Sequence, residues 1–212
     1  MIPNDQTLTT SGMRSDRQGH VLLLACGALA REIVALIDQN NWTHLDLQCL
    51  PAIYHNHPEK IVPAIEAAVA KHRADYTQVF VVYADCGTGG QLQAACDQLG
   101  IEMVPGPHCY AFFAGTEQFS AQDSGTAFYL TDFLVRQFDA FVWEPLGFAK
   151  YPDKFSLLRD MYFGNYETLI YQAQTEDAAL TEKAKTCAAR LGLTFERQFT
   201  GYGDLKTALQ TL

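Results

Sequence analysis

The stretch QVFVVYADCGTGGQLQAACDQLG, residues 78–100, holds the features that decide the fold. Residues 78–84 are a strand-sized apolar run of the kind that parallel sheets bury on both faces. A glycine-rich loop follows, and the spacing of Leu92, Ala95 and Leu99 then predicts a helix with one buried face. A strand, a glycine-rich turn and a helix in this order are typical of an α/β fold.

Similar runs recur along the chain on both sides of this stretch. Further strands are expected at residues 20–25, 45–50, 101–104, 168–173 and 194–200. Further helices are expected at residues 28–40, 58–74, 152–163, 177–191 and 204–212. Because strands and helices alternate, and the helices are long enough for right-handed crossovers, the sequence predicts a mostly parallel, doubly wound α/β sheet. We expect it to be Rossmann-like or flavodoxin-like, with helices on both faces.

The predicted domain organisation is a disordered N-terminal segment at residues 1–18 and a single α/β domain at residues 19–212. The last two β-α units are expected to extend the same sheet, since no linker is long enough to require two domains. Residues 126–142 carry aromatic and aliphatic side chains at helical spacing, which we interpret as core.

Composition and charge exclude several classes of partner. The net charge of −9 comes from 24 acidic and 15 basic residues, and no Lys/Arg run forms a stripe that could follow phosphates. Nucleic acid is therefore not an expected partner. The first residues lack the apolar centre of a secretory signal, and the apolar runs are too short to span a membrane. We expect a cytoplasmic protein whose six cysteines are mostly thiols.

The six cysteines fall into two sets. Cys49, Cys96 and Cys187 share the periodicity of neighbouring apolar residues, so we interpret them as core packing. Cys26, Cys86 and Cys109 instead each follow an apolar strand directly and stand beside turn-forming or helix-opening residues. If their strands are neighbours, the three thiols meet at the carboxyl edge of the sheet, where open α/β folds bind ligands. Three thiolates suit Zn²⁺ or an iron–sulfur cluster, so this set predicts a metal site.

Other residues near this edge are candidates for supporting roles. His108, which adjoins Cys109, is the leading fourth ligand, and His55 and His57 are alternatives. Asp85 precedes Cys86 and is placed to orient a ligand or to exchange a proton, although Asp before Gly is also simple turn chemistry. Asp85 and His108 are therefore the candidate catalytic residues.

Glycine-rich turns next to two of the cysteines suggest a ligand. The loop of Gly87, Thr88, Gly89 and Gly90 opens a helix directly after a strand, an arrangement that binds a small carboxylate or phosphate. Gly27 holds the equivalent position after Cys26. The loop matches neither a dinucleotide-binding nor a P-loop pattern, so a small-molecule substrate is expected rather than a nucleotide.

Several segments, in order, resemble one known family. They are ACGALAREI (25–33), YADCGTGG (83–90), GPHCYAFFAG (106–115), YLTDFL (129–134), RDMYFGNYETLIYQAQT (159–175) and TGYGDL (200–205). The family is the bacterial and archaeal domain of unknown function 1638 (DUF1638). The resemblance implies an association with corrinoid-dependent methyl transfer and one-carbon metabolism, with a corrinoid protein or methyltransferase as a partner.

Three functions follow as hypotheses. The first is a metalloprotein that uses the three-cysteine site for methyl or electron transfer. The second is a metal-free thiol enzyme with one of these cysteines as nucleophile and His108 or His55 as base. The third is a non-catalytic module that binds a corrinoid protein or folate through the aromatic segment at residues 163–166.

Overall fold

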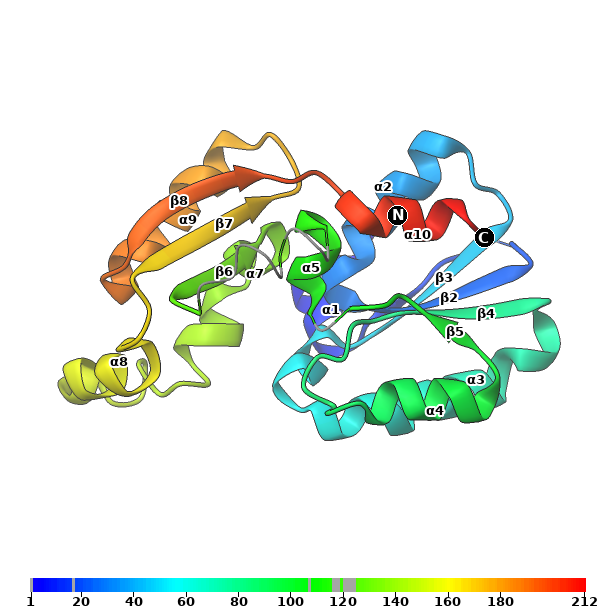
Figure 1. Cartoon of the computed structure of the whole chain (residues 1–212), viewed down its shortest axis with the longest axis horizontal. Helices are drawn as coiled ribbons and strands as arrows, with labels where there is room; N and C mark the ends of the chain where they lie inside the picture. Colours follow the sequence, from blue (N-terminus) through cyan, green and yellow to red (C-terminus); the bar gives the residue numbers. More distant parts are fainter. Residues whose placement is uncertain (1, 17, 107, 116–118, 120–124) are drawn as a thin grey trace. The chain divides into compact units, whose positions relative to one another are not determined.

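Two compact units make up the chain (Figure 1). The computed structural model describes residues 2–16, 18–106, 108–115, 119 and 125–212. The first unit consists of residues 1–109 with 205–212, and the second of residues 110–204. The sequence analysis instead predicts a single domain over residues 19–212. Each unit carries its own sheet. The prediction that the last β-α units extend the first sheet is therefore wrong.

The first unit is built on a five-stranded sheet in the order β1-β3-β2-β4-β5. Its strands are β1 (Met13–Arg14), β2 (Val21–Cys26), β3 (Leu45–Leu50), β4 (Gln78–Val82) and β5 (Glu102–Met103). Strands β2 to β5 pair in parallel, whereas β1 is antiparallel to β3, so the sheet is mixed. Every residue of β2 is buried, as its continuous apolar run predicts.

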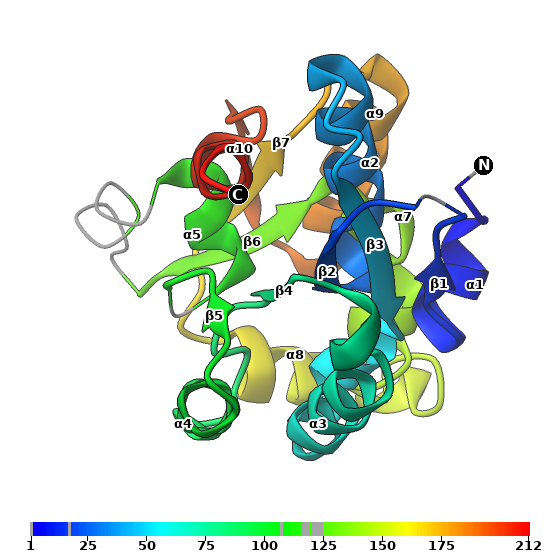
Figure 2. The same ribbon diagram turned by 90° about the vertical axis from the view of Figure 1, so that its right-hand side faces the viewer.

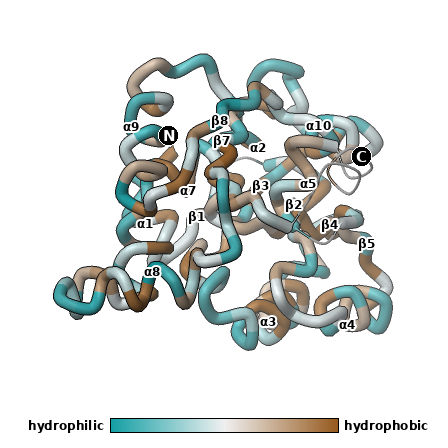
Figure 3. Tube along the Cα trace, turned by 60° about the vertical axis from the view of Figure 1, so that its left-hand side comes forward, coloured by the Kyte–Doolittle hydropathy of each residue, from teal (hydrophilic) through white to brown (hydrophobic). Residues whose placement is uncertain are grey.

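Helices cover both faces of this sheet. They are α1 (Asp5–Thr10), α2 (Ala30–Asn40), α3 (Ile61–His72), α4 (Gln91–Leu99) and α10 (Gly203–Gln210). Helices α3 and α4 lie side by side on one face, and α2 lies on the other (Figures 1 and 2). Along α3 and α4 the colour alternates between apolar and polar (Figure 3), as expected for helices with one buried face.

Residues 2–16 contain a short helix and a short strand, within the segment 1–18 that the sequence predicts to be disordered. Helix α1 is capped by the Asn4 side chain, and β1 pairs with β3. The buried carboxylate of Asp46 holds this segment, because it accepts a 2.9 Å hydrogen bond from Arg14 and further ones from the hydroxyls of Ser15 and Tyr76. The expectation missed this order because Asp46 lies some thirty residues further along the chain.

The second unit has a three-stranded parallel sheet in the order β6-β7-β8. Its strands are β6 (Ala127–Thr131), β7 (Thr168–Ala173) and β8 (Thr194–Phe199). Its helices include α7 (Asp132–Arg136), α8 (Phe155–Phe163) and α9 (Ala178–Leu191). Among the described residues, no helix of either unit has both the length and the apolar character needed to cross a membrane.

The apolar spacing of residues 126–142 suggests one helix, but the structure does not form one there. A strand ends at Thr131, whose side chain caps α7, and a π-helical turn follows at Asp139–Trp143. The buried Asp132 fixes this change of direction by accepting hydrogen bonds from the hydroxyls of Tyr171 and Thr175. Phe133, Phe138, Phe141 and Val142 are buried, so their interpretation as core is confirmed.

Candidate functional site

The strand order brings the ends of distant segments together in the first unit. Strand β2 has β3 on one side and β4 on the other, so the direction in which the chain crosses the sheet reverses there. In open α/β sheets such a reversal leaves a crevice at the carboxyl ends of the strands. Cys26 ends β2, and Cys86 follows β4 after three residues. Cys109, after β5, begins the helix α5 (Cys109–Ala114).

Two of the three sulfurs are in contact. The Sγ atoms of Cys86 and Cys109 lie 3.6 Å apart, and both residues are partly exposed. Cys26 is buried beside them, near enough for its charge to act on both thiols. All six cysteines are free thiols. The 3.6 Å between the Cys86 and Cys109 sulfurs is far longer than a disulfide bond. The fold thus brings Cys86 and Cys109 together although they are 23 residues apart in the sequence.

The thiols differ in acidity because of what surrounds each sulfur. The hydrogen bond with Cys109 lowers the pKa of Cys86, and a hydrogen bond from His55 lowers it further against the effect of burial. The same contact with Cys86, together with burial, raises the pKa of Cys109. Burial raises the pKa of Cys26 to about 12. The pair therefore favours one thiolate and one thiol that share a proton, next to a protonated Cys26.

The histidine that acts on Cys86 is His55. The sequence made His108 the leading candidate because it is next to Cys109. His55 lies in the 3₁₀ turn Ala52–Asn56 that follows β3, and its imidazole bonds to the Cys86 sulfur. The His108 side chain is exposed and is not among the groups that chiefly set the pKa of either thiol. His57 is exposed and lies 3.5 Å from the carboxylate of Glu59.

Asp85 organises the loop that carries Cys86. Its carboxylate accepts hydrogen bonds from the Thr88 hydroxyl at 2.8 Å and from the amides of Gly89 and Gly90 at 3.1 and 2.6 Å. A carboxylate or phosphate at this turn would also draw on backbone amides, and two of them already donate to Asp85. The loop turns tightly, and Cys86 itself has a left-handed φ of 47°. Asp85 is thus a positioning residue for Cys86.

Replacing Asp85 with asparagine should destabilise the protein by about 1–3 kcal/mol at neutral pH. Burial opposes ionisation of Asp85, but the hydrogen bonds from Gly90, Thr88 and Gly89 lower its pKa overall. A lowered carboxyl pKa stabilises the folded state above the unfolded value of about 3.9, and this contribution is lost as pH falls through the folded-state pKa. Urea unfolding at pH 7 and pH 3 should therefore show the difference shrinking in acid.

Asp97→Asn is the matched control for this change. Asp97 is exposed on α4 and accepts one hydrogen bond from the Gln93 side chain. Its replacement should alter stability by no more than about 0.5 kcal/mol. Equal unfolding midpoints for the Asp85→Asn and Asp97→Asn proteins at pH 7 would show that the loop does not depend on the Asp85 charge.

Gly27 has a packing reason for its small size. A Cβ atom there would lie 2.5 Å from the Leu8 carbonyl oxygen and 3.0 Å from that of Leu50. The glycine lets the end of β2 approach the backbone of α1 and β3 closely. A contact with a cofactor at Gly27 stays a prediction, as it does for the loop of Gly87, Thr88, Gly89 and Gly90.

Tyr83 and Cys49 lie next to the site and were not predicted to do so. Tyr83 is buried, and its hydroxyl lies beside the Cys26 thiol and interacts with it. Burial and then the charge of Cys26 raise its pKa. Cys49 is buried one strand away, and burial followed by Cys26 raises its pKa too. A tyrosine directly after a buried strand and three residues before a cysteine is the signal that could have identified Tyr83.

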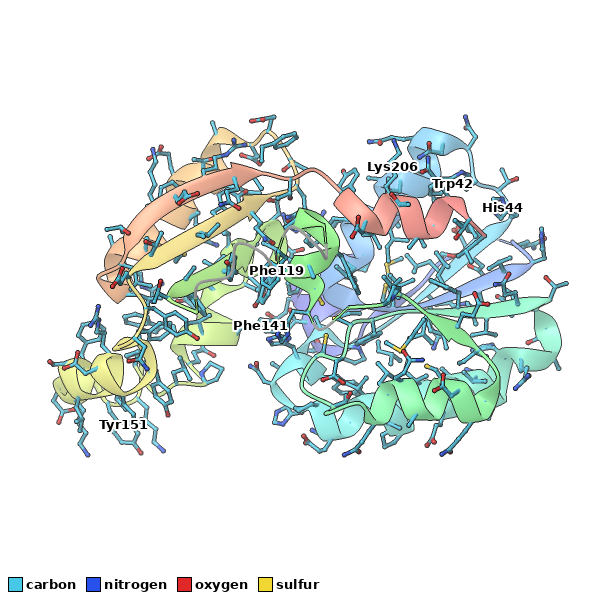
Figure 4. All side chains as sticks on the ribbon, in the orientation of Figure 1. Trp42, His44, Phe119, Phe141, Tyr151 and Lys206 are labelled. Atoms are coloured by element: carbon cyan, nitrogen blue, oxygen red, sulfur yellow. The ribbon has the colours of Figure 1, made fainter. Side chains whose placement is uncertain are left out.

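The aromatic segment at residues 163–166 is part of a packed cluster. Phe163 is buried, and its ring and that of Tyr166 lie 5.1 and 5.8 Å from the ring of Phe128. The exposed apolar side chains of the second unit lie mainly on residues that precede this segment, on α8 and on the turn before α8. Tyr151, in that turn, is one of them and is labelled in Figure 4. A docking role for residues 163–166 stays a prediction.

No metal site is already formed in the part of the chain that the structure describes. There, no three His, Cys, Asp or Glu side chains converge in the way that a metal ion requires. The contact of Cys86 with Cys109 supplies two sulfurs, and Cys26 interacts electrostatically with both.

The chain was compared with known families and proteins. The model of a family described as a protein of unknown function (DUF1638) matches residues 49–209, a range that includes His55, Cys86 and Cys109 and begins after Cys26. No curated protein and no solved structure matches the chain. The match therefore extends over both units and over most of the candidate site.

Proposed function

The chain belongs to the DUF1638 family of proteins of unknown function, and from this premise we propose that it is a metal-binding protein. Cys26, Cys86 and Cys109 would hold Zn²⁺ or an iron–sulfur cluster at the carboxyl edge of the first sheet. The observation that carries the proposal is the 3.6 Å separation of the Cys86 and Cys109 sulfurs. The strand order and the helices on both faces of the sheet support the finer fold assignment, a doubly wound flavodoxin-like unit with a crevice at this edge.

The sulfur separation suits two ligands of one metal ion. Two thiolates bound to a tetrahedral zinc ion at about 2.3 Å are about 3.8 Å apart. In a [4Fe–4S] cluster each iron takes one cysteine, which places the sulfurs further apart. The 3.6 Å separation therefore favours a single tetrahedral ion, or one iron with two cysteine ligands, over a [4Fe–4S] cluster.

The remaining ligands come from the same edge of the sheet. Cys26 supplies a third sulfur, and metal binding would displace the proton that its pKa of about 12 otherwise retains. His55, beside Cys86, is the leading fourth ligand in place of His108. A zinc ion would supply Lewis-acid binding of a substrate thiolate, and a cluster would supply electron transfer.

The biological role in the proposal rests on the family resemblance. Methyl or electron transfer in corrinoid-linked one-carbon metabolism fits a site of soft sulfur ligands that takes a small-molecule substrate. A corrinoid protein or a methyltransferase is the partner class in this proposal. The thiol-rich edge of the first unit is the feature that such a role would use.

Metal content tests the proposal directly. Protein purified without oxygen should contain close to one zinc ion, or iron with visible absorption, per chain. A triple serine variant of Cys26, Cys86 and Cys109 should lose it, whereas a matched triple variant of Cys49, Cys96 and Cys187 should retain it. The proposal fails if no metal co-purifies and neither Zn²⁺ nor iron with sulfide binds on reconstitution.

A metal-free thiol enzyme is the second candidate. The observation that favours it is the bond from the His55 imidazole to Cys86, which lowers the pKa of that thiol. A nucleophilic cysteine with an adjacent histidine base has this arrangement. In this case Cys86→Ser alone should remove labelling by a thiol reagent, while Cys26→Ser should not.

A further inference from the structure

We propose that Cys86 and Cys109 form a reversible dithiol–disulfide couple that exchanges electrons with low-molecular-weight disulfides. The inference rests on the geometry of the pair and goes beyond metal binding, so it does not depend on whether the metal proposal is correct. Its first support is contact, since the two sulfurs are 3.6 Å apart. No other thiol–thiol contact is found among the described residues.

Exposure separates this pair from the other thiols. Cys86 and Cys109 are partly exposed, whereas Cys26, Cys49, Cys96 and Cys187 are buried. Of the six cysteines, Cys86 and Cys109 are therefore the ones that a small disulfide in solution meets first. Since thiol–disulfide exchange requires direct attack of sulfur on sulfur, accessible thiols in contact are the ones that react.

The loop around Cys86 has room for the bond to form. The sulfurs must approach from 3.6 Å to about 2.05 Å. Cβ atoms placed at Gly89 and Gly90 would meet no atom within 4 Å, and one at Gly87 would meet only the Pro58 side chain, at 3.7 Å, so the turn is not tightly packed against backbone. Cys86 is at a left-handed position between Asp85 and Gly87, and small changes in such a turn can bring its sulfur closer to Cys109.

The exchange is balanced in two steps. The Cys86 thiolate attacks one sulfur of the small disulfide, which forms a mixed disulfide and releases one small thiolate. Cys109 then loses its proton to solvent and attacks the Cys86 sulfur, which closes the Cys86–Cys109 bond and releases the second small thiolate. Two protein thiols are oxidised, and one disulfide is reduced to two thiols.

Oxidation and metal binding exclude one another at this pair. A disulfide has no thiolate to offer a metal, so closing the bond removes two of the three sulfur ligands. A bound metal, in turn, would hold both sulfurs against exchange. The couple would thus connect the redox state of the small-thiol pool to occupancy of the site.

Glutathione mixtures provide the test, with full-length protein used as purified and after treatment with a chelator. No Lys or Arg lies between Arg73 and Arg136, so trypsin leaves both cysteines on one peptide. A protease that cuts at acidic residues separates Cys109 from Cys86 at Asp97 or Glu102. Oxidised glutathione should produce a cross-link between these two peptides, and reduced glutathione should remove it.

Single variants identify the bond. The cross-link should be absent from the Cys86→Ser and Cys109→Ser proteins. Cys96→Ser is the control, because Cys96 lies on the same peptide as Cys86. The Cys96→Ser protein should retain the cross-link, because Cys96 is buried on α4. In Cys109→Ser a stable glutathione adduct should accumulate on Cys86. In the chelator-treated protein, a stable adduct on Cys86 in the unchanged sequence, a cross-link to another cysteine, or no reaction would each overturn the proposal. No metal can block exchange in that protein, so its readouts separate this inference from the metal proposal.

Discussion

A Cys86→Ser protein should bind zinc more than about 100-fold more weakly than the unchanged protein. Cys86 is one of the two sulfurs already in contact, and its thiol has the lowered pKa that metal binding favours. A serine hydroxyl stays protonated and is a poor ligand for zinc. Cobalt titration monitored by thiolate-to-metal absorption, followed by competition with zinc, measures the change.

Cys96→Ser is the matched control for this variant, and Cys26→Ser reports on the third ligand. Cys96 is a buried cysteine on the same peptide segment but on helix α4, so its replacement should leave zinc affinity within about threefold of the original. Cys26→Ser should weaken binding as Cys86→Ser does. Equal affinities for all three variants would show that zinc binds elsewhere, and an effect of Cys86 alone would reduce the site to the Cys86–Cys109 pair.

Local patterns were enough to predict most elements of both units. Strands β3 and β7 begin and end at the expected residues, because β3 alternates apolar with polar side chains, β7 is largely apolar, and turn signals flank them. Helix α9 likewise runs from its Asp177 cap to Gly192, which adopts the left-handed conformation typical of a helix end. These signals act within one turn of chain, which is why a single sequence reveals them.

The division into two sheets depends on contacts that no local pattern shows. Residues 127–131 are aromatic and aliphatic, so both a helix and a strand can bury them. The strand is selected by pairing with β7, some forty residues away, and its end is fixed by bonds to Asp132 from Tyr171 and Thr175. Prediction of a second sheet would have required knowledge of which strands pair.

The sequence was enough to predict that Cys86 and Cys109 lie close together, but not which side chains surround them. Cys86 and Cys109 meet because strand order is a consequence of the βαβ connections that the sequence does reveal. The choice of His55 over His108 depends instead on the course of a short turn after β3, because adjacency to Cys109 does not fix the direction of a side chain. The carboxylate of Asp85 likewise turns toward its own loop, where it accepts hydrogen bonds from Thr88 and Gly90.

The pH dependence of alkylation should identify Cys86 as the reactive thiol. An ordinary thiol reacts with iodoacetamide about tenfold faster for each pH unit up to its pKa near 8.5. Contact with Cys109 and then with His55 lowers the pKa of Cys86, so its thiolate is already formed at lower pH. The rate of Cys86 labelling should therefore level off below pH 8, and at pH 6 it should exceed that of an ordinary exposed thiol by about tenfold or more.

Removing either partner should move this profile to higher pH, because each stabilises the thiolate more than the thiol. Cys109→Ser should give the larger shift and His55→Gln a smaller one, in the order of their influence on the pKa of Cys86. His57→Gln is the matched control, since His57 is exposed in the same loop and pairs with Glu59. A midpoint near 8.5 in the unchanged protein, or the same midpoint in Cys109→Ser, would mean that the two sulfurs do not share a proton. A shift in both variants would instead tie the acidity of Cys86 to the contacts that place it beside Cys109 and His55, which is the arrangement that metal binding, nucleophilic attack and disulfide exchange all require.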